Sequence, residues 1–148
     1  MKFFTIEGSA QNTSEAINLC ASVFEENGCV TESFAKDCID REKEYPTGIP
    51  SKASVAIPHC STDSILDDAI CYLRLDEPVT FMRMDDDAEA IQTRHVFCLA
   101  LSRKNHLKTL SKLIQRLQEE KFIDTLEHAE FSEITGFLKS NLDVDSDQ

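Results

Sequence analysis

The chain of 148 residues has no tryptophan, only four glycines and four prolines, and no long apolar run. Its longest apolar stretch, residues 96–101, is far too short to span a bilayer, and residues 1–6 lack the apolar stretch of a signal peptide. No internal repeat or low-complexity tract is present. We therefore expect a cytoplasmic protein with no direct membrane insertion, folded as one domain over residues 1–148 with a frayed polar tail at about 143–148.

Basic residues are also scarce, since 15 lysines and arginines face 27 acidic residues and the formal charge is −12. Such a surface repels the phosphates of nucleic acid and of anionic lipids, so we expect no nucleic acid partner. An acidic surface can steer a basic protein partner into encounter, or it can merely keep the chain soluble. Charge alone leaves these two alternatives open.

The six cysteines include no Cys-x-x-Cys pair, and most of them fall on apolar stripes, where a thiol acts as a small apolar group. A disulfide framework or a zinc site is therefore not expected. Asp85-Asp86-Asp87 lacks the ligand spacing and the glycine of a calcium loop, so it is interpreted as a solvated turn. We expect no metal and no cofactor.

Apolar residues recur at helical spacing in the first part of the chain. Residues 12–15 form a capping box before an amphipathic helix that stops at Gly28. Thr31 is expected to cap a second helix, which must end before Pro46. Arg41 continues the apolar stripe of this second helix, so an arginine is expected in line with a face that packs on the core.

Short apolar runs predict strands in the middle of the chain. A strand at 55–57 ends at Pro58, which has no donor for a sheet ladder. Two strands at 70–75 and 79–84 flank an Asp-Glu-Pro stretch and are expected to form an antiparallel pair joined by a turn. Residues 96–102 are typical of a buried strand.

Helices are predicted again in the last third of the chain. Asn105 is expected to cap a long amphipathic helix, which puts His106 in its first turn. Two shorter helices are predicted at 122–126 and 134–138. The fold class is therefore α/β, with a central mixed β-sheet flanked by α-helices.

His59 and His106 both follow predicted strands, and ligands of open α/β sheets bind beyond the carboxyl ends of strands. Parallel strands would bring both imidazoles to one edge of the sheet, beside free helical N–H groups that suit phosphate. A neutral imidazole is a nucleophile near pH 7, so His59 can accept a phosphoryl group. Arg41 would supply a permanent charge and a planar fork for the phosphate oxygens, and a neutral His106 would donate one hydrogen bond.

Each of these residues has a simpler interpretation. His59 and His106 can be ordinary structural histidines, and Arg41 can extend from a helix end or pair with Glu42 or Glu44. His95 and His128 are interpreted as surface or strand-edge residues. A thiol nucleophile at Cys60 is the remaining alternative, but adjacent residues of an extended chain point to opposite faces, so Cys60 and His59 do not form a dyad.

A specific resemblance is carried by two segments, Arg-Glu-Lys-Glu-Tyr-Pro-Thr-Gly-Ile at 41–49 and Val-Ala-Ile-Pro-His at 55–59. Together they resemble the signature of the mannitol/fructose-type enzyme IIA family of bacterial sugar phosphotransferase systems. In that family an Arg-Glu pair and a Thr-Gly turn precede the phosphorylated histidine. The resemblance implies a tele-phosphohistidine on His59 and a phosphoryl-binding arginine at Arg41.

The resemblance extends to the segment around Asn-His-Leu at 105–107, where members related to the mannitol branch carry a second active-site histidine, here His106. It implies a mixed sheet of about five strands with helices on both sides. Cys60 and the Pro-Ser-Lys-Ala-Ser stretch at 50–54 depart from the mannitol and fructose pattern, whose members have glycines there. Pro-His-Cys at 58–60 is more similar to the galactitol-type branch.

The resemblance implies a phosphotransferase component that takes a phosphoryl group from the phosphorylated histidine phosphocarrier protein on His59. It would pass the group to a cysteine of the cognate enzyme IIB, for uptake of galactitol or a related hexitol through the membrane enzyme IIC, which it serves only indirectly. The alternative within the same fold is a regulatory nitrogen-type paralogue that binds other proteins according to its phosphorylation state.

Overall fold

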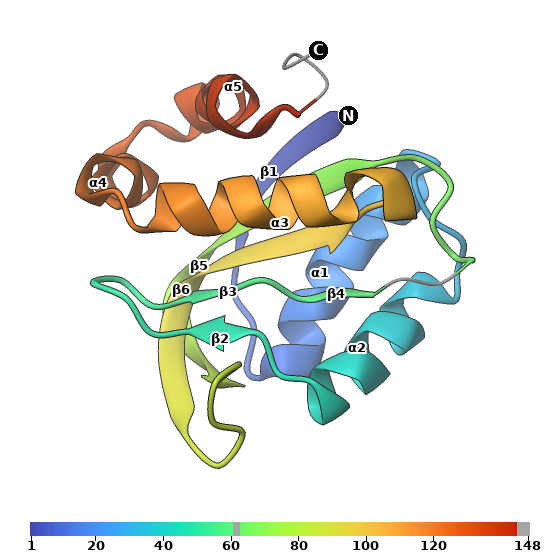
Figure 1. The fold of residues 1–148 in the computed structure, drawn as a ribbon, viewed down its shortest axis with the longest axis horizontal. Coiled ribbons are helices and arrows are strands. Elements are labelled where there is room, and N and C mark those ends of the chain that lie inside the picture. The colour runs from blue at the N-terminus through green and yellow to red at the C-terminus, as the bar shows by residue number, and fades with distance from the viewer. Residues whose placement is uncertain (61–62, 145–148) are drawn as a thin grey trace.

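The computed structural model describes residues 1–60 and 63–144. In chain order its elements are β1 (Lys2–Gly8), α1 (Thr13–Glu26), α2 (Phe34–Glu44), β2 (Gly48–Ile49), β3 (Val55–Ala56), β4 (His59–Cys60), β5 (Ala69–Met82), β6 (Ala90–Ala100), α3 (Arg103–Leu117), α4 (Glu120–His128) and α5 (Phe131–Leu142). A mixed sheet lies between two layers of helices (Figure 1). This confirms the predicted α/β class and the helices on both faces.

The sheet has six strands in the order β1-β5-β6-β3-β2, with β4 paired to β6 beyond β3. β3 and β4 run parallel to β6 in one unbroken register, because Val55 pairs with His95 and His59 with Leu99. Pro58 divides what would otherwise be one strand, since it has no N–H, although its carbonyl still accepts a hydrogen bond from the Leu99 N–H at 3.0 Å. This division gives six strands where about five were expected.

The predicted hairpin between 70–75 and 79–84 is wrong, because residues 70–75 and 79–82 belong to the single strand β5. Its partner is β6, which pairs antiparallel with both halves, and the register shifts between Arg74 and Val79. Pro78 is tolerated inside the strand because it falls in this irregular stretch, where the ladder is already interrupted. The chain reverses instead between β5 and β6, at the three aspartates.

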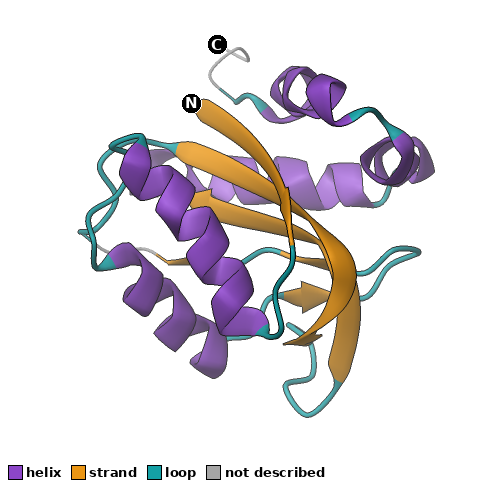
Figure 2. Ribbon diagram, turned by 180° about the vertical axis from the view of Figure 1, so that it is seen from behind, coloured by secondary structure: helices purple, strands orange, loops and turns teal. Residues whose placement is uncertain are grey.

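Helices cover both faces of the sheet (Figure 2), and each face has its own hydrophobic core. Along β6, Val96, Cys98 and Ala100 pack with α1 and α2, whereas Phe97 and Leu99 pack with the carboxyl-terminal helices, as does Leu101 just after the strand. In β4, Cys60 belongs to the first core. His59 therefore points to the other face, the one covered by α3, as the alternation of an extended chain predicts.

The helix boundaries refine the predictions. The predicted start of α1 is confirmed in part, since the Glu15 N–H donates to the capping Asn12 Oδ1 at 2.9 Å, while the Glu15 carboxylate accepts from the Asn12 side chain. Gly28 follows the helix with a φ of 71°. Ser33 precedes α2 in place of Thr31, and Ser102 precedes α3 in place of Asn105. The two last helices are longer than predicted.

At the carboxyl end Val144 is buried, so the predicted fraying does not extend to it, and residues 145–148 lie outside the described part of the chain. Every helix in the described ranges is too short or too polar to cross a bilayer.

Candidate functional site

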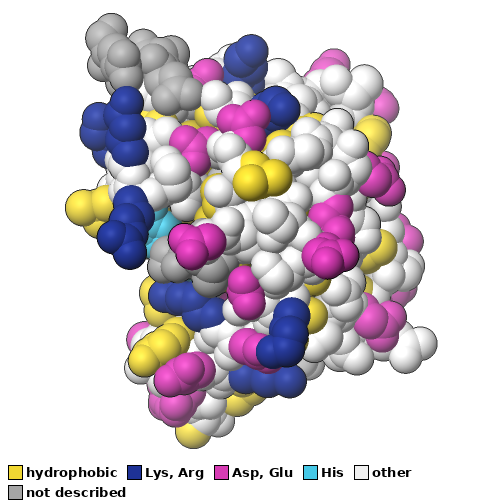
Figure 3. Space-filling model, turned by 90° about the vertical axis from the view of Figure 1, so that its right-hand side faces the viewer, with side chains coloured by type: hydrophobic (Ala, Val, Ile, Leu, Met, Phe, Trp, Pro, Cys, Tyr) yellow, Lys and Arg dark blue, Asp and Glu magenta, His cyan; other side chains and the backbone are white. Residues whose placement is uncertain are grey.

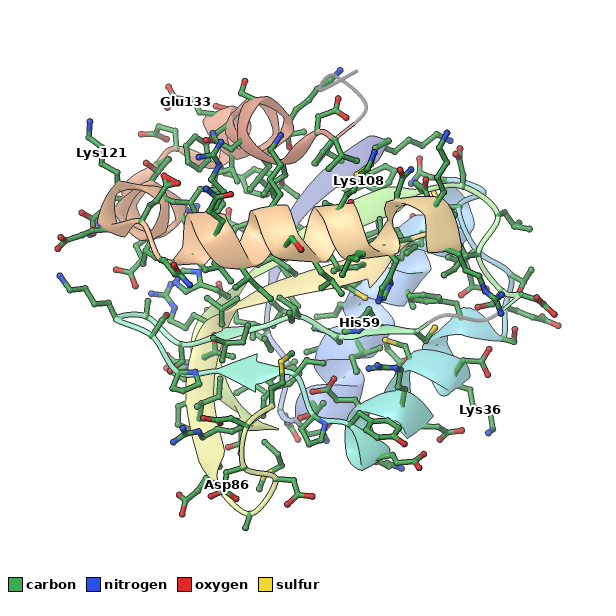
Figure 4. The ribbon with its side chains drawn as sticks, in the orientation of Figure 1. Lys36, His59, Asp86, Lys108, Lys121 and Glu133 are labelled. Carbon is green, nitrogen blue, oxygen red and sulfur yellow. The ribbon has the colours of Figure 1, made fainter. Side chains whose placement is uncertain are left out.

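A cleft of about 750 Å³ opens between the end of α2, the β3–β4 segment, the β5–β6 loop and α3. Arg41, His59 and His106 all line this cleft. The structure therefore brings together the three residues that the sequence singled out, from three separate elements. Figure 4 shows His59 between α3 and the helix α2.

His59 is only 5% exposed, and its ring is held by a backbone carbonyl two residues earlier in the chain. Its Nδ1 lies 2.7 Å from the carbonyl oxygen of Ile57. Because a carbonyl only accepts, Nδ1 carries the proton and Nε2 keeps the lone pair. Burial is the largest cause that lowers the pKa of His59, and the hydrogen bond to Ile57 opposes it. The nearby Arg41 and His106 lower the pKa as well, so the net shift is downward and favours the neutral ring at pH 7.

His106 faces His59 across the cleft, with ring centroids 5.1 Å apart and ring planes at 57°. The parallel pairing of β3 and β4 with β6 explains this approach, because it brings the segments that follow these strands to the same edge of the sheet. The pKa of His106 is lowered by burial first and by Arg41 second. A neutral His106 was expected from the helix dipole, and the structure adds these two causes.

The start of α3 is fixed by a residue that the sequence analysis missed. Asp68 Oδ1 accepts a hydrogen bond from the Ser102 N–H at 2.5 Å, and its Oδ2 accepts one from the Asn105 side chain. Asn105 therefore lies within the first turn of α3 and ties that turn to Asp68, instead of capping the helix. No local pattern could reveal Asp68, since it lies 34 residues before Ser102.

Arg41 lies in the last turn of α2, with its guanidinium carbon 5.5 Å from the centre of the Tyr45 ring. Within residues 1–60 and 63–144 no carboxylate pairs with it, so the predicted alternative of an ion pair with Glu42 or Glu44 is wrong. Tyr45 holds the guanidinium through its ring face, which leaves the N–H groups available in the cleft.

Glu42 has a separate role in the local structure. It is 6% exposed and accepts hydrogen bonds from the N–H of Thr47 at 2.8 Å and from its hydroxyl. The Thr47 hydroxyl in turn accepts the N–H of Ile57 at 3.2 Å. The Arg-Glu and Thr-Gly parts of the sequence signature are thus joined to the segment that carries His59. Burial raises the pKa of Glu42 to about 7.

Exposed apolar side chains surround the cleft and are unusual for a solvent-facing surface. In the cleft lining Tyr45 is 59% exposed, Met84 48% and Ile114 37%, and Leu107, which follows His106 in α3, is 74% exposed. The exposed Arg103, Lys104 and Lys108 lie at the start of α3. Figure 3 shows Lys and Arg side chains close to the place where a histidine reaches the surface. An apolar rim with charged flanks is typical of a surface that docks a protein partner.

The acidic wall of the cleft is the predicted turn at Asp85-Asp86-Asp87, which is exposed. Arg83 forms an ion pair with Asp85 at 2.6 Å. In the described part of the chain no group of three or more potential ligands lies close enough to hold a metal ion. The cleft thus combines a nucleophile and cationic or neutral donors with an acidic segment.

The other two histidines lie away from the cleft lining. His95 was expected at a surface or strand edge, and this is wrong: it is buried in the middle of β6, with Nδ1 2.6 Å from the Tyr72 hydroxyl and Nε2 3.4 Å from Glu127. The run of alternating polar residues before it concealed its burial. His128 is exposed, as predicted.

Comparisons with known proteins agree with this geometry. The 32%-identical galactitol-specific EIIA component of the Escherichia coli phosphotransferase system aligns over 100 residues, 67% of each chain. The crystal structure of IIA mannitol from E. coli superposes with a TM-score of 0.74 at 25% identity, covering 93% of this chain and 95% of that one.

A second solved structure, the complex of enzyme IIA and phosphorylated enzyme IIB of the E. coli mannitol system, matches with a TM-score of 0.74 at 24% identity over 94% of each chain. The family model of the phosphoenolpyruvate-dependent sugar phosphotransferase system, EIIA 2, matches residues 2–141. The chain therefore belongs to the type-2 enzyme IIA family, whose members are phosphotransferase components of that system.

Proposed function

We propose that this protein carries a phosphoryl group on Nε2 of His59, taken from the phosphorylated histidine phosphocarrier protein and passed to a cysteine of an enzyme IIB. One observation carries the proposal. The hydrogen bond from His59 Nδ1 to the Ile57 carbonyl leaves the Nε2 lone pair as the nucleophilic position of this neutral ring.

Two in-line displacements complete the cycle. In the first, Nε2 of His59 attacks the phosphorus on the phosphocarrier, the donor N–P bond breaks, and the carrier's imidazole leaves with the electron pair. In the second, the enzyme IIB thiolate attacks and the N–P bond on His59 breaks, which restores the neutral ring. Arg41 and His106 stabilise the charge on the transferring oxygens, so catalysis is positioning and electrostatics, with no cofactor.

The rim of the cleft supports a protein partner in both steps. Docking on Tyr45, Met84, Leu107 and Ile114 would exclude water from the phosphoryl group. The solved complex of a related mannitol IIA with phosphorylated IIB supports an enzyme IIB as the acceptor. The galactitol-specific relative supports galactitol or a related hexitol as the cargo, which would pass through enzyme IIC in the membrane while this chain acts in the cytoplasm.

The test is incubation with phosphoenolpyruvate, enzyme I and the histidine phosphocarrier, followed by intact-mass analysis and peptide mapping. One acid-labile phosphoryl group is expected on the wild type and on a His128→Ala control, whose histidine is on the surface. His59→Ala should accept none. Undiminished labelling of His59→Ala would overturn the proposal.

Transfer of the phosphoryl group to an enzyme IIB distinguishes the transport role from the regulatory alternative. The labelled protein, mixed with a galactitol-type enzyme IIB, should lose its phosphoryl group to a cysteine of that partner. A protein that accepts the group but passes it to no enzyme IIB would instead fit the regulatory nitrogen-type alternative.

A further inference from the structure

Two polar side-chain atoms in the described part of the chain are buried without a hydrogen-bond partner, and both belong to α3. They are Nδ1 of His106 and the hydroxyl of Thr109. Buried polar atoms are nearly always paired in folded proteins, so two unpaired ones in the same helix need an explanation. Their position beside the cleft makes the explanation relevant to His106.

Helix geometry makes His106 and Thr109 neighbouring positions on the surface of α3. Residues three apart in a helix have Cβ atoms about 5–6 Å apart, and helical side chains lean toward the preceding turn. The Thr109 side chain therefore leans toward the turn that carries His106. A helical threonine hydroxyl ordinarily bonds to a carbonyl of that preceding turn, but Thr109 makes no such bond and is 0% exposed.

We infer that Thr109 is a positioning residue for His106, its hydroxyl donating a hydrogen bond to Nδ1 after a rotation about the Cα–Cβ bond of Thr109. Nδ1 then acts as the acceptor, so the ring proton is held on Nε2. Nε2 is the nitrogen with which His106 can reach into the cleft, because Nδ1 is the buried one.

The role of this hydrogen bond in phosphoryl transfer rests on the proposed function. The two imidazoles would then present opposite groups: His59 a lone pair on Nε2, fixed by the Ile57 carbonyl, and His106 an N–H on Nε2, fixed by Thr109. The lone pair attacks phosphorus, and the N–H donates to a phosphoryl oxygen. In the other tautomer His106 would direct a lone pair at the oxygens and repel them.

The tautomer itself can be measured without any phosphoryl transfer. In multiple-bond ¹H–¹⁵N spectra at about pH 8, where both imidazoles are neutral, His106 should show the proton on Nε2 and His59 on Nδ1. Thr109→Val keeps the side-chain shape but removes the donor, so the His106 proton should redistribute toward Nδ1. Thr109→Ser should restore the wild-type pattern. A His106 tautomer that is the same in Thr109→Val as in the wild type would overturn the inference.

Stability and transfer give two further readouts. If the hydroxyl is bonded to His106, Thr109→Val should lower the melting temperature and Thr109→Ser should recover most of the loss. If the hydroxyl has no partner in solution, valine should raise the melting temperature, which would contradict the inference. Transfer to enzyme IIB should slow about tenfold in Thr109→Val, on the scale of one weakened donor.

An unchanged transfer rate in Thr109→Val, despite an altered tautomer, would overturn the positioning role. Failure of the wild type to accept a phosphoryl group would count against the proposed function alone, since the spectra do not depend on it.

Discussion

The Glu42 carboxylate accepts hydrogen bonds from both the N–H and the hydroxyl of Thr47, at a position where both side chains are buried. The Thr47 hydroxyl accepts the N–H of Ile57, and the Ile57 carbonyl accepts Nδ1–H of His59. A chain of hydrogen bonds therefore runs from the last turn of α2 to the candidate nucleophile. A substitution of Glu42 should therefore alter the position of the His59 ring.

Glu42 should make stability depend on pH. Burial raises its pKa from 4.5 to about 7, so the folded protein binds the proton more tightly than the unfolded chain. Between about pH 4.5 and 7 the free energy of unfolding should therefore fall as pH rises, by about 3 kcal/mol from this group. Glu42→Gln cannot titrate and should remove this component. Urea unfolding at about pH 4 and about pH 8, one value on each side of this range, measures the difference.

Glu44→Gln is the matched control, because Glu44 is exposed and two residues further along the same helix end. Its stability should follow the wild type at both pH values. Parallel curves for Glu42→Gln and the wild type would show that Glu42 does not titrate in this range.

The position of the phosphoryl group on the ring is a second prediction. Since Nδ1 of His59 is committed to the Ile57 carbonyl at 2.7 Å, the N–P bond should form at Nε2. ³¹P–¹⁵N coupling in the labelled, phosphorylated protein should locate phosphorus on that nitrogen alone. Coupling to Nδ1 would require the ring to leave its hydrogen bond and would contradict the proposed geometry.

Local patterns in the sequence singled out Arg41, His59 and His106, which the structure brings to one cleft. Pro58 breaks a strand just before His59, and the helix after β6 starts just before His106, so both histidines follow strand ends in the sequence itself. The parallel order of β3, β4 and β6 then makes them neighbours. Sequence reasoning succeeded here because each signal lies within a few residues of the side chain that it concerns.

Features of the fold that depend on contacts between residues far apart along the chain could not be predicted from the sequence. The strand β1 pairs in parallel with β5, more than sixty residues later, and no strand was predicted at residues 2–8. His95 is polar, yet the Tyr72 hydroxyl on the neighbouring strand makes its burial possible. The Asp-Glu-Pro stretch has turn residues, but pairing of β5 with the long strand β6 overrides that local preference.

Gly48 should tolerate no side chain, and this is the third prediction. A Cβ placed there would lie 2.5 Å from the Met82 carbonyl oxygen and 2.9 Å from Ile91. Gly48→Ala should therefore cost about 1–3 kcal/mol of stability and displace the neighbouring Thr47. Gly136→Ala, in α5 with open space around it, should instead stabilise by about 0.5–1 kcal/mol. Thermal melting of both variants is the measurement, and equal effects would contradict the close approach at Gly48.

The last prediction separates the charge of Arg41 from its shape. Arg41→Lys keeps the positive charge that lowers the pKa of His59, so acceptance of the phosphoryl group should keep its dependence on pH. It loses the planar fork that lies against Tyr45, so transfer to enzyme IIB should slow by about 10- to 1000-fold, the scale of one lost transition-state donor. Lys43→Ala removes an exposed charge from the same helix end and should leave transfer within about twofold, because surface charges act weakly at a distance. Stopped-flow transfer rates across about pH 6 to 8 compare the variants. Wild-type rates in Arg41→Lys would show that any cation at this position suffices and that the fork has no part in the transfer.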